Sequence, residues 1–183
     1  MIYAAMLKID GWPCVVVGGG RIASRKAAGL IDAGAAVTVI APHIGNEMRN
    51  LAVKMLRVKP FEPADLAGCR LVISATGHRD VDGAVHAAAE AQQILCNSAD
   101  DPSNCNFILP ARWDRGDVHV AVSTNGQSPT AAQWLRDRLA DGSLGNETEE
   151  IAQILARLRA RVRDQGMSSE DYDFRSLLRP GPA

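Results

Sequence analysis

Short apolar runs rich in β-branched residues alternate with alanine-rich stretches through the N-terminal part of the chain. The apolar runs are typical of strands, whereas the alanine-rich stretches repeat their apolar positions at helical spacing. This pattern predicts strands at 14–17, 36–40, 56–58, 71–76 and 94–97. It predicts helices at 26–33, 46–53 and 80–92. Because strands that alternate with helices pair in parallel, we expect an α/β fold with a Rossmann-like, doubly wound sheet.

A glycine-rich turn, Gly18-Gly19-Gly20, joins the first strand to the first helix. With Ala23 it fits the pattern G-x-G-x-x-A. In this pattern Gly18 permits a tight turn, Gly20 lets a pyrophosphate approach the backbone, and Ala23 lets the helix pack close to the strand. The N–H groups at the start of the helix would then face the phosphates. A strand on each side favours a dinucleotide site over the alternative, a glycine-rich turn that binds nothing.

The loop after the second strand lacks the acidic residue that usually holds the ribose of NAD. Asp or Glu commonly stands there in dinucleotide-binding folds, whereas this chain reads Ile40-Ala41-Pro42-His43. Either the protein is not a generic dehydrogenase, or backbone groups near Pro42 and His43 hold the ribose. The loop also has no arginine cluster for a 2′-phosphate, which favours NAD over NADP.

Two adjacent carboxylates, Asp100 and Asp101, follow the strand predicted at 94–97. Ligands of doubly wound sheets bind beyond the carboxyl ends of the strands, so this loop is expected to reach the same crevice as the glycine turn. A carboxyl beside a like charge tends to have a raised pKa and is suited to act as a general base. The alternative is that the two residues only form a turn before Pro102.

The C-terminal part of the chain has a different organisation. It predicts a strand at 118–123, a helix at 130–139 that Ser128-Pro129 begins, and an amphipathic helix at 147–163. A short helix at 167–178 and a frayed tail at 179–183 would end the chain. We therefore expect three domains, at 1–112, 113–145 and 146–183. The strand at 118–123 has few local partners, which is compatible with pairing across chains.

Composition narrows the classes of partner. There are 20 Lys and Arg against 21 Asp and Glu, so a net charge of −1 gives no general attraction to nucleic acid or to a membrane surface. No stretch approaches the ~20 apolar residues of a membrane span, and the four cysteines show no C-x-x-C spacing. The four histidines lack a metal-ligand spacing. We expect a soluble, cytoplasmic protein with reduced core thiols and no fixed metal.

Several motifs along the chain are distinctive in their order. They are Val17-Gly18-Gly19-Gly20, Arg25-Lys26-Ala27, Ala33-Gly34-Ala35, Ala75-Thr76, Cys96-Asn97 before Asp100-Asp101-Pro102, Phe107-Ile108-Leu109-Pro110, Asp114-Arg115-Gly116, and Ser123-Thr124 before Gly126-Gln127-Ser128-Pro129. The last block is the most specific, since few Rossmann domains follow their final strand with such a segment. In these motifs the chain resembles the precorrin-2 dehydrogenase and sirohydrochlorin ferrochelatase module of siroheme synthases.

That resemblance implies an NAD-dependent oxidoreductase that acts on CH–CH bonds and converts precorrin-2 to sirohydrochlorin in siroheme biosynthesis. In some members the protein is also a ferrochelatase, a lyase that inserts ferrous iron, so ferrous or cobaltous ion would be a further substrate. The family's acid/base residue for both reactions falls on Asp100. One base suits both, because oxidation must lose a proton and metal insertion must strip protons from pyrrole nitrogens.

The resemblance also implies cofactor contacts and a subunit interface. Beyond Gly18 and Gly20, the contacts with NAD fall on Arg21, Ile22, Pro42 and His43. The middle domain would form a homodimer that contributes to each cleft.

The chain departs from the family pattern in one wall of the cleft. Gly77-His78-Arg79-Asp80 stands where the family is usually acidic, and Asp82 stands where Asn is frequent. Two functions of other classes stay open: a regulatory dimer that senses NAD without redox catalysis, and a chelatase or tetrapyrrole carrier only.

Overall fold

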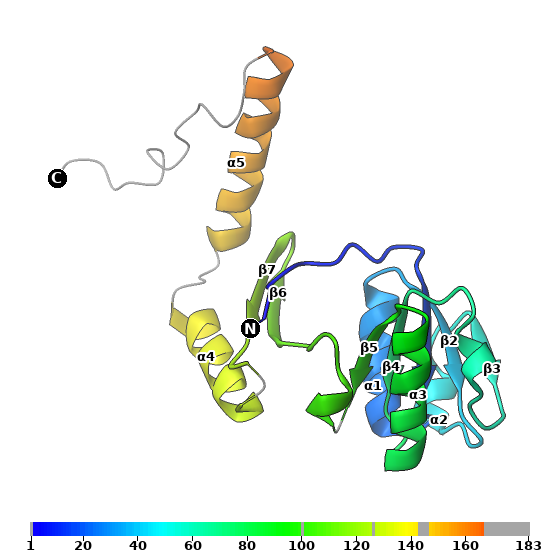
Figure 1. Cartoon of the computed structure of the whole chain (residues 1–183). Helices are drawn as coiled ribbons and strands as arrows, with labels where there is room; N and C mark the ends of the chain where they lie inside the picture. The colour runs from blue at the N-terminus through cyan, green and yellow to red at the C-terminus, as the bar shows by residue number, and fades with distance from the viewer. Residues whose placement is uncertain (1, 100, 126, 143–146, 167–183) are drawn as a thin grey trace. The chain divides into compact units, whose positions relative to one another are not determined.

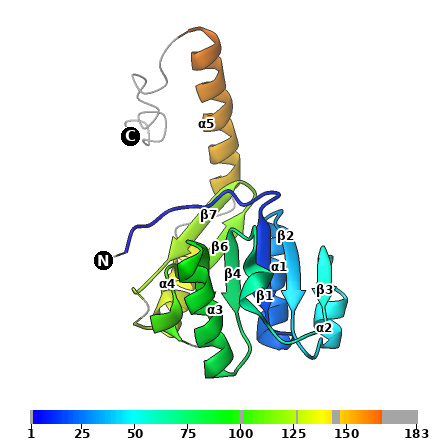
Figure 2. The same ribbon diagram turned by 45° about the vertical axis from the view of Figure 1, so that its right-hand side comes forward.

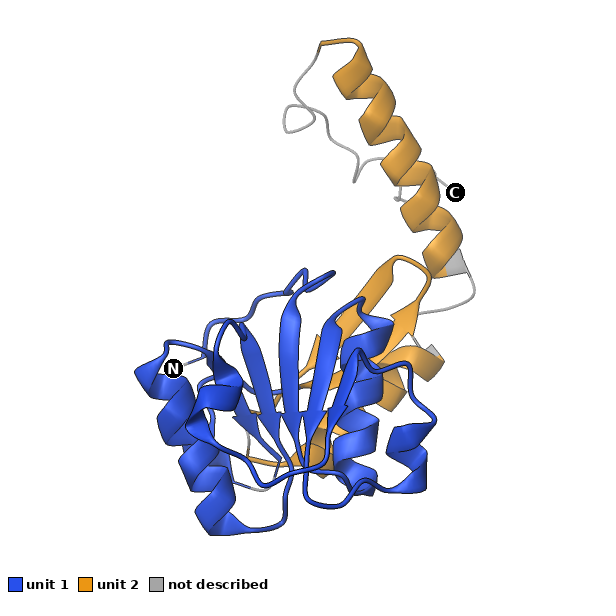
Figure 3. Cartoon of the chain, turned by 90° about the vertical axis from the view of Figure 1, so that its right-hand side faces the viewer, with its two compact units in different colours: residues 1–109 blue, residues 110–183 orange. Residues whose placement is uncertain are grey.

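The computed structural model describes residues 2–99, 101–125, 127–142 and 147–166. The chain divides into two compact units, residues 1–109 (unit 1) and residues 110–183 (unit 2), which Figure 3 colours separately. This division falls close to the boundary predicted after residue 112, and the boundary predicted after residue 145 lies inside unit 2. The helix predicted at 167–178 and the tail that follows it lie outside the described residues.

Unit 1 is built on a parallel sheet (Figure 1). Its strands are β1 Pro13–Val17, β2 Ala36–Ile40, β3 Met55–Arg57, β4 Leu71–Ser74 and β5 Leu95–Ser98. They lie in the order β3-β2-β1-β4-β5, and every neighbouring pair is parallel. Strands with near-continuous apolar runs suit a sheet that is covered on both faces. The predicted doubly wound α/β architecture is confirmed.

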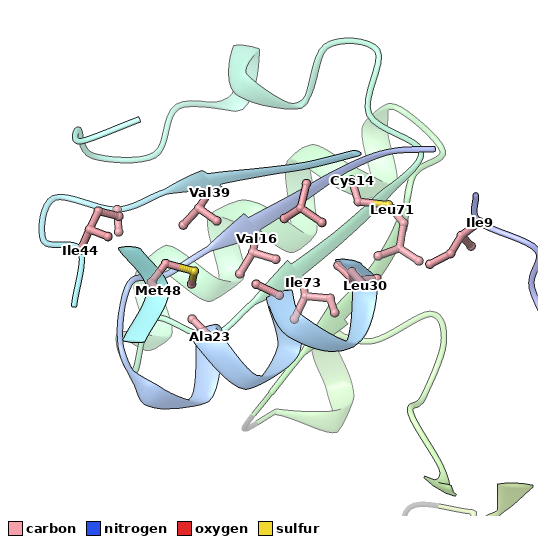
Figure 4. Packing of buried hydrophobic residues seen from close by; sticks show 13 residues of the cluster. Ile9, Cys14, Val16, Ala23, Leu30, Val39, Ile44, Met48, Leu71 and Ile73 are labelled. Carbon is pink, nitrogen blue, oxygen red and sulfur yellow. The ribbon is translucent and has the colours of Figure 1, made fainter. Parts of the chain in front are cut away.

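Helices cover the two faces of this sheet through separate apolar clusters. The connecting elements are α1 Arg21–Asp32, α2 Asn46–Arg49, η1 Pro63–Leu66, α3 Arg79–Ala91 and η2 Pro102–Asn104, where η denotes a 3-10 helix. One cluster packs α1 and α2 on the sheet through residues such as Val16, Ala23 and Met48 (Figure 4). The other contains Val15 of β1 and Val85 of α3. Neighbouring residues of β1 therefore point to opposite faces, as the pleat requires.

Helix α1 begins directly after the glycine turn, earlier than the start at Lys26 that the sequence predicts. Gly20 has extended backbone angles, φ −87° and ψ −177°, and is the N-cap residue. The Ser24 hydroxyl donates to the Gly20 carbonyl at 3.0 Å, which closes the first turn. The alanine pattern reports only the buried face of the helix, whereas Arg21 and Ile22 at its start are exposed.

The strand order creates a topological switch point between β1 and β4. From β1 the chain continues to β2 and β3 on one side, and β4 and β5 lie on the other. The loop after β1 leads to α1 on one face of the sheet, whereas the loop after β4 leads to α3 on the opposite face. In open α/β sheets, ligands bind beyond the carboxyl ends of the strands at such a point.

Unit 2 consists of a hairpin and two helices in its described part. The elements are β6 Ala111–Arg115, β7 Val118–Val122, α4 Pro129–Gly142 and α5 Glu147–Asp164. The two strands pair antiparallel, and α4 packs against both of them (Figure 2). Both helices extend over the segments that the sequence predicts. Across the described part of the chain, every helix is too short or too polar to cross a bilayer.

The prediction that the strand at 118–123 has few local partners is wrong. Its partner is β6 of the same chain, so it does not lack local partners. The hydrophobic pattern does not predict β6, because charged residues interrupt its apolar positions. Asp114 lies opposite His119, and a hydrogen bond of 2.6 Å between the Asp114 carboxylate and the His119 ring joins the two strands.

Candidate functional site

Gly18 ends β1 in a conformation that only glycine adopts without strain. Its φ is +129°, and its N–H donates to the Ile40 carbonyl at 2.9 Å. A Cβ atom at Gly18 would lie less than 3.0 Å from the carbonyl oxygen of Ala75, in the loop after β4. The first glycine of the pattern therefore serves both the turn and the close approach of β4.

Gly19 is required by a different contact. A Cβ atom there would lie less than 3.0 Å from the carbonyl oxygen of His43. The Gly19 carbonyl accepts a hydrogen bond from the Gly45 N–H at 2.9 Å. The middle glycine, to which the G-x-G-x-x-A pattern gives no role, thus fixes the loop after β2 against the turn.

Gly20 differs from both neighbours because the space around it is open. It is exposed, and a Cβ atom there would have no atom within 4 Å. Its φ is that of an ordinary residue. A side chain at this position would therefore occupy the open space beside the backbone without disturbing the turn. This is the property expected of a position where a ligand approaches the backbone.

The start of α1 leaves its backbone donors available to a ligand. No side chain caps the helix, and its first turn contains no acidic residue. Ala23 is fully buried against Gly18, which keeps the helix close to β1. Uncapped N–H groups at a helix start attract anions, since they lack partners within the helix and lie at its positive end.

A pocket of about 290 Å³ lies between the glycine turn and α2. Its lining consists of Gly19, Gly20, Arg21, Ser24, Gly45, Asn46 and Glu47. Among the predicted cofactor residues, Gly20 and Arg21 line it. Gly18, Ile22, Pro42 and His43 do not, although the His43 carbonyl contacts the turn at Gly19.

The sequence analysis missed the pocket residues Asn46 and Glu47. They follow β2 by several residues and reach the turn because the loop that carries them bonds to Gly19. The available signal was Glu47 itself, the first acidic residue after β2. Glu47 lines the same pocket as Gly20, although no acidic residue ends the strand.

The loop after β5 holds the predicted catalytic pair. Asp100 lies outside the described residues. Asp101 is the N-cap of η2 and accepts hydrogen bonds from the Ser103 N–H at 2.9 Å and the Ser103 hydroxyl at 2.5 Å. These bonds, with smaller contributions from Arg79 and His86, lower the pKa of Asp101. A carboxylate stabilised in its charged form is a weak base, so Asp101 serves the turn.

The described residues contain no group of three or more His, Cys, Asp or Glu side chains that is placed to hold a metal ion.

Comparison with known proteins identifies the family of the chain. A family model described as "Putative NAD(P)-binding" matches residues 5–111, which is more than half of the chain. The chain belongs to this NAD(P)-binding family. A second family model, "Sirohaem biosynthesis protein central", matches residues 115–141 in unit 2. The matches adjoin each other near the boundary between the two units.

Several known relatives of this chain are named siroheme synthases. A siroheme synthase of Methylococcus capsulatus is 45% identical over 86% of this chain, and siroheme synthase 1 of Aeromonas salmonicida is 39% identical over 85%. The chain spans about a third of their length, 34% in both cases. A solved structure described as SirC, precorrin-2 dehydrogenase, has a TM-score of 0.75 and 28% identity. The match covers 92% of this chain and 84% of that one. These findings confirm the resemblance and the fold.

Proposed function

We propose that the protein is an NAD-dependent precorrin-2 dehydrogenase that forms sirohydrochlorin in siroheme biosynthesis. The observation that carries the proposal is the similarity to the solved precorrin-2 dehydrogenase over 92% of the chain. A match of this extent includes unit 2 as well as the nucleotide-binding unit, so it favours this activity over the many others that use a Rossmann-like domain. The open glycine turn supports the same conclusion.

The residues of the pocket fit a dinucleotide. The open space at Gly20 would admit a pyrophosphate, the uncapped N–H groups of α1 would donate to it, and Arg21 adds a positive charge. The Glu47 carboxylate in the same pocket would repel a 2′-phosphate, which favours NAD over NADP. Ile22, Pro42 and His43 stay proposed contacts outside this lining.

The reaction removes two hydrogens from the substrate. NAD held at the glycine turn would supply the acceptor for one of them as a hydride, and a base of the protein would accept the other as a proton. We assign the base to Asp100, which lies between β5 and η2 in the sequence. The state of its neighbour supports this choice, since the Asp101 carboxylate is engaged with Ser103 and has a lowered pKa.

Anaerobic oxidation of precorrin-2 by the full chain with NAD tests this proposal. Asp100→Asn is expected to lower kcat by at least about 100-fold, the scale of general acid–base catalysis, with an unchanged Kd for NAD. Asp101→Asn is the matched control, because the amide oxygen of Asn can still cap η2 while the charge is lost, and it is expected to keep kcat. Loss of turnover in Asp101→Asn with full activity in Asp100→Asn would reverse the assignment.

The same assay distinguishes this function from the two alternative functions. Binding of NAD without oxidation would favour a regulatory sensor, and binding of sirohydrochlorin without any need for NAD would favour a chelatase or carrier. Insertion of ferrous or cobaltous ion stays a prediction from the resemblance, and addition of each ion to freshly formed sirohydrochlorin tests it. A cytoplasmic location also stays a prediction.

We further propose a homodimer that forms through unit 2. Its helices expose large apolar side chains, namely Trp134, Leu135 and Leu139 on α4 and Ile151 and Ile154 on α5. Exposed apolar side chains that gather on one element are typical of a surface that a partner covers.

A further inference from the structure

The buried carboxylate of Asp82 accepts hydrogen bonds both from the end of β4 and from the loop that follows it. Asp82 lies in the first turn of α3 and is only 6% exposed. Its Oδ1 atom accepts hydrogen bonds from the Ser74 hydroxyl, from the Thr76 hydroxyl at 2.8 Å and from the Thr76 N–H at 3.4 Å. Ser74 is the last residue of β4, so a single oxygen joins the strand, its loop and the next helix.

Thr76 extends this hydrogen-bond network to His78. Its hydroxyl has one hydrogen, and Asp82 at 2.8 Å is a closer acceptor than the His78 carbonyl at 3.2 Å. The hydroxyl oxygen then accepts the His78 N–H at 3.0 Å. The His78 carbonyl in turn accepts the Asp82 N–H at 3.0 Å. The loop after β4 is therefore closed on itself through Asp82.

The residue between the two anchored positions contacts the glycine turn. Ala75 donates its N–H to the Val17 carbonyl at 2.9 Å. Its own carbonyl oxygen lies where a Cβ atom of Gly18 would stand. The residues on both sides of Ala75, Ser74 and Thr76, are therefore bonded to Asp82. The contact between Ala75 and Gly18 lies at the switch point between β1 and β4.

We propose that Asp82 is a positioning residue for dinucleotide binding. It holds Ala75 against Gly18 and thereby fixes the turn that presents Gly20 and the N-terminus of α1. Loss of its acceptor oxygen would free the Ser74 and Thr76 donors and let the turn shift. This inference rests on the proposed function, since it requires a dinucleotide at the glycine turn.

The test compares NAD affinity among full-length variants by calorimetry, well below the unfolding temperature. Asp82→Ala is expected to raise the Kd for NAD at least about tenfold, the scale of a lost hydrogen bond to a charged group. kcat at saturating NAD should stay nearly unchanged, because Asp82 supports binding rather than proton transfer. Asp82→Asn keeps an acceptor oxygen and is expected to restore most of the affinity. A purely structural role would lower Tm without changing the Kd of the folded protein.

Asp80→Ala is the matched control. Asp80 is the other acidic residue in the first turn of α3 and is exposed, so its loss removes the same charge without the contacts. Its Kd for NAD is expected to equal that of the wild type.

Ser74→Ala keeps the test decisive if Asp82→Ala does not fold. It removes one donor to Asp82 from a buried strand end, and it is expected to raise the Kd several-fold. Unchanged Kd values in the variants that fold would overturn the role of Asp82 alone, provided that the wild type binds NAD. Failure of the wild type to bind NAD would overturn the proposed function, and this inference with it.

Discussion

The three glycines of the turn perform different tasks although they are adjacent. Gly18 has a positive φ and accommodates Ala75, Gly19 accommodates His43, and Gly20 leaves open space at the start of α1. Two of them therefore hold the loops after β4 and β2 in place, and the third faces the open space where we propose that the dinucleotide binds. Substitutions of these glycines should therefore separate an effect on the stability of the fold from an effect on ligand binding.

We predict opposite outcomes for Gly19→Ala and Gly20→Ala. The methyl group of Gly19→Ala would overlap the His43 carbonyl, and overpacking of this kind lowers the free energy of unfolding by about 1–3 kcal/mol. Gly20→Ala should lower it by less than about 1 kcal/mol, since only a helix N-cap changes. Its affinity for NAD should fall at least about tenfold, because the methyl group takes the place of the approaching pyrophosphate.

Urea unfolding and calorimetric titration with NAD measure both quantities in each variant. Wild-type affinity in Gly20→Ala would show that the ligand does not approach this position.

The buried thiols give a second prediction for single residues. Burial raises the pKa of Cys14 to about 11 and that of Cys96 to about 12. Because the thiolate is the reactive form, neither residue should be alkylated by iodoacetamide at pH ~8 while the protein is folded. Both should react fully in denaturant. Mass spectrometry of the modified peptides reports each cysteine separately, and rapid labelling of Cys14 in the native protein would contradict the core described for β1.

Local sequence could predict only part of this site. The spacing of Gly18, Gly20 and Ala23 marks the turn, because the positive φ of Gly18 and the packing of Ala23 on Gly18 involve residues close together in the chain. Gly19 and Glu47 take their roles from a contact between two loops, which spacing does not reveal. The role of Asp100 comes from the resemblance and stays a prediction.

At the scale of elements, an ionic network joins β3 to η1. The Asp65 carboxylate lies 3.2 Å from Arg57 and 3.0 Å from Lys59, and it accepts the Glu62 N–H at 2.9 Å. Burial of this side chain acts to raise its pKa, but the hydrogen bonds from Lys59, Glu62 and Arg57 together outweigh burial and lower it. The folded state therefore favours the charged carboxylate.

This network predicts a pH dependence of stability. A carboxyl whose pKa is lower in the folded state stabilises the protein above its unfolded pKa of about 4, and this contribution is lost as the pH falls through the folded value. Asp65→Asn should therefore be less stable than the wild type near neutral pH. The difference in the free energy of unfolding between the wild type and Asp65→Asn should narrow steadily below pH ~4. Urea unfolding over a pH series checks this, and a constant difference at all pH values would contradict it.

The sequence predicts elements best where one face is buried and apolar. The β2 bounds match the prediction in full, since alternating valines lie in a covered sheet. By contrast, the pattern does not predict β6, because its charged residues Arg112 and Asp114 pair with each other and Asp114 also bonds across the hairpin to His119. Helix α2 ends at Arg49 instead of residue 53, and Leu51 and Val53 pack against the core from the segment that follows.

At the scale of the whole molecule, the proposed dimer can be tested on one helix. Trp134 of α4 is 59% exposed. Trp134→Glu should convert a dimer into a monomer in sedimentation experiments, because a charged side chain would replace a large apolar one at the interface. Gln133→Glu is the control, since it places the same charge on a neighbouring polar position. A wild-type monomer, or a dimer that persists in Trp134→Glu, would contradict the proposed interface.

The proposed activity is the transfer of a hydride from precorrin-2 to NAD. The most direct measurement follows sirohydrochlorin and NADH together in one anaerobic reaction with purified full-length protein, alongside Gly20→Ala. We expect the two products to form in equal amounts with the wild type, and both to form far more slowly with the variant at the same low NAD concentration. A wild-type protein that binds NAD and precorrin-2 but forms neither product would contradict the proposed dehydrogenase activity.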